Sequence, residues 1–281
     1  MIFTWMIDET GEISEVTSLN LQNLTNLDEV TRRLPQGAYT TFRTYEGNGV
    51  LRFKDHLARL SETAELMGKP MRIMENRVRN GLGAFFKLNN GGEDFRIRLT
   101  LDLSQNPGAL FLSSEPLECL PDSFYENGVK VITSSLHREN PRAKATQFIE
   151  KAMDEKKSLP EGVNEAIMVD EDGFLLEGLS SNFFAVLRDA VWTANDRVLS
   201  GITRRIVLEE VDKAGIQLHL TPVQKKDLPG CTEAFITSTS RAVLPVVEID
   251  DLMIGNKKPG PVTKLLLDRY QKRVRAELDW L

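Results

Sequence analysis

The stretch from Asp94 to Ser104 alternates strongly between apolar and polar residues. Its odd positions are apolar, and its even positions carry arginine, threonine or aspartate, the period-two pattern of a strand with one buried and one solvated face. QNPG follows as a turn signal, and ALFLSS after it predicts the second strand of a hairpin. The chain therefore contains a half-buried sheet.

Helical and strand patterns alternate over the rest of the chain. Apolar periodicity predicts helices at residues 54–68, 71–88, 145–158, 202–215 and 262–278, and further strands at 129–135, 164–170, 183–188, 216–220 and 233–240. A break falls at Leu117–Gly128, where Pro121 and polar residues separate two strand regions. We expect a smaller α+β half, followed by a strand-rich half with a few helices.

Composition excludes several classes of protein. A chain of 281 residues forms one large domain or two modest ones, and its net charge of −6 argues against a general nucleic-acid binder. No apolar run approaches the length of a membrane span, and residues 1–15 lack the pattern of a signal peptide. Two distant cysteines fit a reducing compartment, and three scattered histidines do not suggest a metal site. We expect a cytoplasmic enzyme.

Three segments could bind an anion. VLSGITRRI is a strand end, a glycine and a helix start, so the N–H groups of Ile202 and Thr203 would favour a phosphate or carboxylate. The run after Phe235 supplies hydroxyls, among them Ser238 and Thr239, and Arg59 in FKDHLARL could bind phosphate bidentately. Taken singly, a capped helix, a polar turn and a solvated helix face explain each of them.

A lysine and a glutamate complete the pattern. Lys144 lies between a proline-marked turn and an apolar helix, where a desolvated lysine can form a Schiff base. Glu177 opens EGLSSNFF, with Asn182 five residues later. A phosphate site, an amine and an acid that keeps a pyridine nitrogen protonated together suggest pyridoxal 5′-phosphate (PLP).

EGLSSNFF, with VWTANDRVLSGITRR after it, resembles the signature of the class IV PLP-dependent enzymes. That family includes branched-chain aminotransferases, D-amino acid aminotransferases and aminodeoxychorismate lyases. Its pattern has a glutamate, a small residue, an asparagine and an aromatic residue, then a threonine, and then a glycine among hydrophobic and basic residues. FKDHLARL, PRAK and FITSTSRAVLPVVEID match as well, so the resemblance spans residues 37 to 281.

The resemblance implies a fold and a set of roles. The fold is α/β (α+β), like that of D-amino acid aminotransferase, with a small N-terminal α/β domain at residues 1–118, a larger C-terminal pseudo-barrel domain at 119–281, and a homodimer. Lys144 would be the Schiff-base lysine and the proton shuttle, and Glu177 would pair with the pyridine nitrogen. The phosphate would be held by Arg59, Ile202, Thr203, Ser238 and Thr239.

The chain departs from the family where the substrate pocket is usually shaped. Residues 23–45 lack the aspartate-arginine-glycine segment and the glycine-aspartate-glycine turn. Arg98 falls where branched-chain enzymes carry an arginine on the substrate side, and Ile149 is aliphatic, as in the other two branches. The substrate-binding prediction comprises Arg98, Arg96 on the same strand face, Arg43 and Thr40.

The leading interpretation is a transaminase that acts on an amino acid and a 2-oxo acid. The second is an aminodeoxychorismate lyase that releases pyruvate and 4-aminobenzoate, since Thr40 and Thr41 resemble a threonine pair of some lyases. A third is a non-catalytic protein of the same fold that binds PLP or a carboxylate, and the plainest is an unrelated α/β protein. The hand of the amino acid stays open, because both hands occur in the family, which hosts several chemistries on one scaffold.

Overall fold

The computed structural model describes residues 2–17, 19–89 and 92–281. Its chain divides into two compact units: unit 1 is Met1–Glu118, Ala143–Met153 and Glu277–Leu281, and unit 2 is Cys119–Arg142 and Asp154–Ala276. Two short segments, one from the middle and one from the end of the sequence, therefore belong with the N-terminal part of the chain. The helix α5 (Gln147–Lys157) begins in unit 1 and ends in unit 2.

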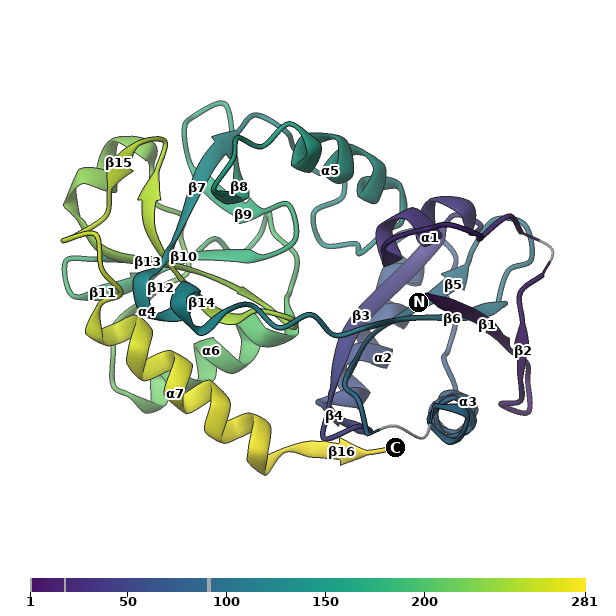
Figure 1. The fold of residues 1–281 in the computed structure, drawn as a ribbon. Helices are drawn as coiled ribbons and strands as arrows, with labels where there is room; N and C mark the ends of the chain where they lie inside the picture. Colours follow the sequence, from purple (N-terminus) through teal and green to yellow (C-terminus); the bar gives the residue numbers. More distant parts are fainter. Residues whose placement is uncertain (1, 18, 90–91) are drawn as a thin grey trace. The chain divides into compact units, whose positions relative to one another are not determined.

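Unit 1 is built on one sheet. Within the described residues the sheet has seven strands in the order β16-β4-β3-β5-β6-β1-β2, and all its pairings are antiparallel. The strands are β1 (Phe3–Ile7), β2 (Ile13–Glu15), β3 (Gly37–Tyr45), β4 (Gly49–Leu51), β5 (Phe95–Asp102), β6 (Leu110–Pro116) and β16 (Leu278–Trp280). The predicted hairpin is confirmed as β5 and β6. The last strand of the chain, β16, pairs with β4, which lies more than 200 residues earlier in the sequence (Figure 1).

Helices cover both faces of this sheet. They are α1 (Leu27–Arg33), α2 (Phe53–Leu66) and α3 (Glu75–Leu88). The apolar residues of β5 pack with those of α2 and α3 in one core cluster. The other face of β5 is also buried, so the expectation of a half-solvated strand was wrong. The reason is α1, which the hydrophobic pattern did not predict: it packs on β6 and contacts the Arg98 side chain on that face.

The predicted helix 71–88 begins later than expected, at Glu75. The segment before it is extended and is tied to α2 by a hydrogen bond from the Ile73 N–H to Ser61 Oγ (3.4 Å). Gly81 has a packing role in this helix, because a Cβ there would stand 2.8 Å from Ile7 Cδ1. The glycine thus lets α3 lie close against β1.

Unit 2 contains a mixed sheet of nine strands within its described residues. Its main order is β12-β11-β10-β13-β14-β7-β8-β9; β9 also pairs with β10, and β15 pairs with β14. The strands are β7 (Val129–Ser134), β8 (Val163–Val169), β9 (Leu175–Gly178), β10 (Asn182–Leu187), β11 (Ala190–Trp192), β12 (Leu218–His219), β13 (Cys231–Ser238), β14 (Ala242–Ile249) and β15 (Leu252–Met253). Because β9 pairs with both β8 and β10, the strand order closes on itself as in a barrel.

Three α-helices and a 3-10 helix complete unit 2. They are α4 (Asp122–Asn127), α6 (Ile202–Lys213), α7 (Pro261–Ala276) and η1 (Lys225–Gly230). Ion pairs join α6 to α7, as between Arg273 Nη1 and Glu210 Oε1 at 2.6 Å. The described helices include none that is both long and apolar enough to cross a lipid bilayer.

Candidate active site

Glu177 lies in β9 with its side chain buried, and its cross-strand partner is Asn182, the first residue of β10. The Asn182 amide donates to Glu177 Oε2 (3.2 Å) and to the Leu199 carbonyl (2.8 Å). The Leu199 N–H donates to the same carboxylate oxygen (3.0 Å). EGLSSN therefore forms a tight connection between two strands, with Glu177 at one end and Asn182 at the other. Both end residues hydrogen-bond to Leu199, in the segment that leads into α6.

Two arginines set the electrostatics around this carboxylate. Arg138 Nε lies 3.3 Å from Glu177 Oε1, and both side chains are buried. An opposite charge at this distance favours the ionised carboxylate. Burial lowers the pKa of Arg204 below its ordinary value, although the nearby Glu177 charge acts in the opposite direction. Glu177 is thus a buried anion, suited to pair with a ligand N–H.

Helix α6 begins after Gly201, and no side chain caps it. Its first two residues, Ile202 and Thr203, are buried. A Cβ on Gly201 would stand 2.1 Å from Asn182 Oδ1, so a glycine is needed for this close approach. The N–H groups of an uncapped first turn attract a phosphate or carboxylate. Because Gly201 packs on Asn182, the helix start and Glu177 are held by the same contacts.

Thr237 in β13 is also a cross-strand partner of Asn182. Directly paired residues project from the same face of a sheet, so Glu177, Asn182 and Thr237 form one row. Thr237 is 2% exposed, and its Oγ1 has no hydrogen-bond partner among the residues that the structure describes. Buried hydroxyls usually have a partner. An unsatisfied hydroxyl in the same row as the buried acid, with Asn182 between them, indicates a place for a polar ligand.

The predicted phosphate residues Ser238 and Thr239 lie where β13 turns into β14, and Arg241 holds this turn. Arg241 Nε donates to Ser238 Oγ (3.2 Å), and Nη2 donates to Glu165 Oε2 (2.8 Å) and Ser180 Oγ (2.9 Å). Ser180 also donates to Glu165 Oε2, at 2.8 Å. One arginine therefore fastens the hydroxyl-bearing turn to the connection that follows Glu177.

Glu165 is fully buried in β8 and ion-paired with Arg241. Burial pushes the pKa of Glu165 up, but the charges of Arg241 and Lys156 and the hydrogen bonds from Arg241 and Ser180 outweigh it and hold the pKa below the ordinary 4.5. Glu165 and Arg241 were not among the predicted site residues. Arg241 lies in RAV, after the hydroxyl run, and Glu165 lies in NEAIM, in a predicted strand. Nothing in the sequence indicated that these two residues form an ion pair. No group of three or more His, Cys, Asp or Glu that could hold a metal occurs within the described ranges.

Lys144 belongs to unit 1, because its segment lies beside β3. Its carbonyl accepts from the Tyr39 N–H (3.0 Å), its N–H donates to Thr63 Oγ1 (3.2 Å), and the next residue forms a β-bridge to Ala38. Lys144 Nζ lies over the Tyr39 ring, 4.6 Å from its centroid. The main chain is thus fixed on both sides, while Lys144 as a whole is only partly buried.

Arg59 is 6% exposed on α2. Its Nη2 donates to Thr40 Oγ1 (2.8 Å) and lies 3.5 Å from His56 Nδ1, and Thr40 Oγ1 and His56 Nδ1 are 3.0 Å apart. Thr40, predicted to bind substrate, is fully buried and contacts the predicted phosphate arginine. The structure therefore brings Arg59 and Thr40 together.

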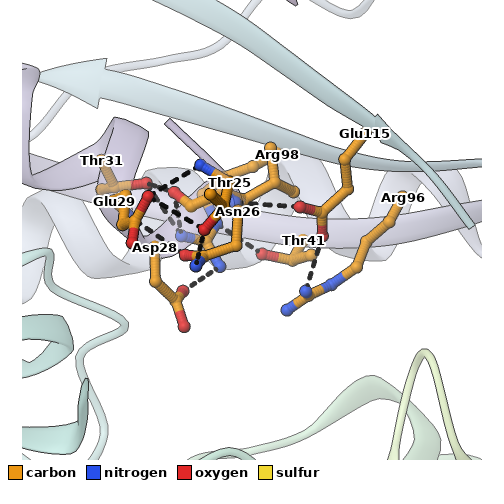
Figure 2. A network of polar contacts seen from close by, with 10 residues as sticks. Thr25, Asn26, Asp28, Glu29, Thr31, Thr41, Arg96, Arg98 and Glu115 are labelled. Atoms are coloured by element: carbon orange, nitrogen blue, oxygen red, sulfur yellow. Dashed lines mark hydrogen bonds and ion pairs between the residues drawn. The ribbon is translucent and has the colours of Figure 1, made fainter. Parts of the chain in front are cut away.

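Arg98 is buried under α1, as Figure 2 shows. Its Nη1 donates to the Leu27 carbonyl (3.0 Å) and Thr31 Oγ1 (2.8 Å). Its Nη2 forms an ion pair with Asp28 (2.8 Å), and its Nε donates to Thr41 Oγ1 (3.0 Å). Three of these contacts join Arg98 to α1 and one joins it to β3, so the arginine fastens α1 to the sheet. The guanidinium carbon also lies 4.8 Å from the centroid of the Tyr39 ring, the ring that Lys144 contacts.

The other two predicted substrate cations also have acidic partners. Arg96 Nη1 lies 2.7 Å from Glu115 Oε1, and Glu115 Oε2 accepts from the Leu27 N–H at the start of α1 (3.0 Å; Figure 2). Arg43 Nη2 is 3.5 Å from Asp94, and its guanidinium lies over the Tyr45 ring. Each of these two arginines is thus paired with an acidic residue of unit 1.

Comparison with known proteins identifies the family of this chain. The amino-transferase class IV family model matches residues 37–249. D-alanine aminotransferase of Bacillus licheniformis is 28% identical over 86% of this chain and 88% of its own length. The branched-chain-amino-acid aminotransferase of Pseudomonas aeruginosa is 24% identical over 87% of each.

Solved structures share the fold. The T.th. branched-chain amino acid aminotransferase with pyridoxamine 5′-phosphate superposes with a TM-score of 0.80 at 21% identity, covering 99% of this chain and 98% of that one. The branched-chain aminotransferase of Thermoproteus uzoniensis with norvaline gives 0.78 at 22% identity, with coverage of 99% and 98%. A mixed α/β fold of the aminotransferase type is therefore confirmed. The chain belongs to the class IV aminotransferase family.

Proposed function

We propose that this class IV aminotransferase uses PLP to move an amino group between an amino acid and a 2-oxo acid. The observation that carries the proposal is the buried Glu177 carboxylate, which is tied through Asn182 and Leu199 to the uncapped start of α6. A carboxylate next to an anion-binding helix end suits a ligand with a protonated ring nitrogen at one side and a phosphate at the other.

The residues present fit PLP. Its ring nitrogen needs an acid, its phosphate needs donors and its aldehyde needs an amine, and the chain offers Glu177, the first turn of α6 and Lys144 for these. The unsatisfied, buried Thr237 hydroxyl in the row of Glu177 supports a polar ligand there. Bound PLP supplies the electron sink that makes the α-proton of an amino acid acidic enough to remove.

Lys144 has two roles in the proposal. Its amine would hold the coenzyme at the aldehyde, and it would carry the proton to and from the substrate α-carbon. Main-chain hydrogen bonds to Tyr39 and Thr63 hold the lysine in place. The Tyr39 ring offers its π face to the ammonium when the amine carries the proton.

The remaining assignments concern the phosphate. Arg59 provides a buried guanidinium, and Ile202 and Thr203 provide N–H groups and a hydroxyl. Ser238 and Thr239 provide hydroxyls from a turn that Arg241 anchors. A phosphate that accepts several such hydrogen bonds holds the coenzyme firmly while its other end reacts.

The substrate class follows from the family, and both a D-alanine and a branched-chain aminotransferase resemble this chain. We therefore propose amino acids and 2-oxo acids as substrates, with a homodimeric enzyme in the cytoplasm. The lyase is not proposed, because these relatives are aminotransferases. Arg98 is proposed to act on substrate only indirectly, by supporting Tyr39 and α1, since its donors are engaged within the protein.

The test is a half-reaction. The PLP-loaded protein is mixed singly with L- and D-amino acids, and the coenzyme is then released by denaturation and identified by chromatography. We expect conversion to pyridoxamine 5′-phosphate with amino acids of one hand. Lys144→Ala, which removes the proposed proton carrier, should slow this conversion by at least about a thousandfold. Lys151→Ala, at an exposed position on α5, is the control. Unchanged PLP with every amino acid would contradict the proposal.

A further inference from the structure

Three buried side chains in unit 1 form a hydrogen-bonded group: Thr40 on β3, and His56 and Arg59 on α2. Thr40 and His56 are each 0% exposed, and Arg59 is 6% exposed. His56 and Arg59 are three residues apart, so they share one face of the helix, and that face packs on the strand that carries Thr40. A buried guanidinium held in this way has a fixed orientation.

The direction of the Arg59 contact follows from its donors. Arginine can only donate, so the 2.8 Å contact makes Thr40 Oγ1 an acceptor from Arg59 Nη2. Thr40 Oγ1 also lies within hydrogen-bond distance of His56 Nδ1, at 3.0 Å. Arg59 Nη2 faces the same nitrogen, at 3.5 Å. The Thr40 hydroxyl and the Arg59 guanidinium therefore both meet His56 on the Nδ1 side of its ring.

The group is also packed in place. The His56 ring meets the Phe42 ring edge to face, with centroids 5.2 Å apart, and Phe42 belongs to the main core cluster of unit 1. The imidazole therefore has little freedom to rotate. His56 fixes the Thr40 hydroxyl, and Thr40 in turn fixes one nitrogen of Arg59.

We infer that Thr40 and His56 are positioning residues that set the Arg59 guanidinium for an anionic phosphate ligand. This rests on the proposed function, in which Arg59 binds the phosphate of PLP. It gives Thr40 a role different from the predicted contact with substrate, because its hydroxyl group already contacts both Arg59 and His56. Arginine binds phosphate best in a planar, bidentate geometry, so loss of orientation weakens binding even though the charge remains.

The experiment compares PLP with pyridoxal, which lacks the phosphate, by equilibrium titration of the apoprotein. In Thr40→Val and in His56→Leu, affinity for PLP should fall about tenfold, the loss of about one charge-assisted hydrogen bond. Affinity for pyridoxal should stay unchanged. Thr40→Ser keeps the hydroxyl, and His56→Asn keeps an acceptor near Nδ1, so both should retain the preference for PLP. Circular dichroism confirms that each variant is folded.

Thr44→Val is the matched control. Thr44 lies on the same strand, is equally buried, and hydrogen-bonds to Asp94 and to the Phe95 N–H rather than to Arg59. Its loss should reduce stability and leave the ratio of PLP to pyridoxal affinity unchanged. The combination of Thr40→Val with Arg59→Gln should bind PLP no more weakly than Arg59→Gln alone, because the threonine acts through the arginine.

The outcomes separate this inference from the proposed function. If Arg59→Gln abolishes the preference for PLP over pyridoxal while Thr40→Val and His56→Leu keep it, the positioning role is wrong and the phosphate role of Arg59 stands. If Arg59→Gln itself keeps the preference, the phosphate assignment fails and the positioning role fails with it.

Discussion

The buried anion of unit 2 and the buried cation of unit 1 make an instructive pair. Glu177 is held by Asn182 and Leu199, five and 22 residues away in sequence. Arg98 is held by α1 and Thr41, and its partners are 57 to 71 residues away. Each group has several hydrogen-bond partners, those of Glu177 being at its Oε2 atom. They differ in that the hydrogen-bond partners of Glu177 lie within one recognisable motif, whereas those of Arg98 lie in different segments of the chain.

The comparison shows how a charged residue in a sequence pattern can be misjudged. A buried charge needs partners, because desolvation without them is expensive. For Glu177 the pattern itself supplies Asn182, so its place in a site is readable. For Arg98 the pattern supplies a strand position only, and the carboxylate that neutralises it belongs to a helix that the periodicity missed.

The largest effect should come from Arg98. Arg98→Met leaves Asp28 and the α1 contacts without their buried cation, and should lower the free energy of unfolding by about 3 kcal/mol. Arg96→Met, whose ion pair is more exposed, should cost less than about 1 kcal/mol. Denaturant titration followed by circular dichroism measures both. If Arg98→Met is as stable as wild type and only its KM is raised, Arg98 binds substrate directly, and its structural role is contradicted.

A smaller effect is expected where the glutamate motif meets α6. In Gly201→Ala the added Cβ would meet Asn182 Oδ1 at 2.1 Å, and the strain should cost about 1–3 kcal/mol. It should also weaken PLP binding, because the helix start moves relative to Glu177. Gly83→Ala is the control, because a Cβ there meets nothing within 4 Å, and it should stabilise α3 by about 0.5–1 kcal/mol. Equal thermal midpoints for the two variants would contradict the packing of Gly201 on Asn182.

The smallest effect concerns pH. The pKa of Glu165 in the folded protein is below its ordinary value of 4.5, because Arg241 and Ser180 outweigh the effect of burial. Its contribution to stability is thus complete above 4.5 and is lost as the pH falls through the folded pKa. We expect wild type to lose more stability than Glu165→Gln between neutral pH and about pH 3. Denaturation midpoints at the two pH values test this, and equal losses would show that Glu165 is not the titrating group.

Much of the fold follows from local patterns, and the exceptions have physical causes. The β5–β6 hairpin was predictable because alternation and a turn signal lie next to each other. The second buried face of β5 was missed because α1 has only seven residues, too few for a clear period. Its ends did carry signals: Asn26 caps the helix, acidic residues occupy the first turn, and Arg32 and Arg33 the last.

The candidate site shows the same division. The contact of Glu177 with Asn182 follows from a short connection between paired strands, which sequence spacing encodes. The ion pair of Glu165 with Arg241 joins residues 76 positions apart, and only the folded sheet brings them together. The three-residue spacing of His56 and Arg59 can also be read in the sequence. The contact of both residues with the Thr40 hydroxyl cannot, because Thr40 lies on a separate strand.

One measurement tests the central claim, that Lys144 carries the coenzyme, most directly. The PLP-loaded protein is treated with borohydride, digested and analysed by mass spectrometry. We predict the phosphopyridoxyl mass on the peptide that contains Lys144, and its absence from the same digest of Lys144→Ala. The same mass on a different lysine of the wild-type protein, or on none while the protein transaminates, would contradict the account.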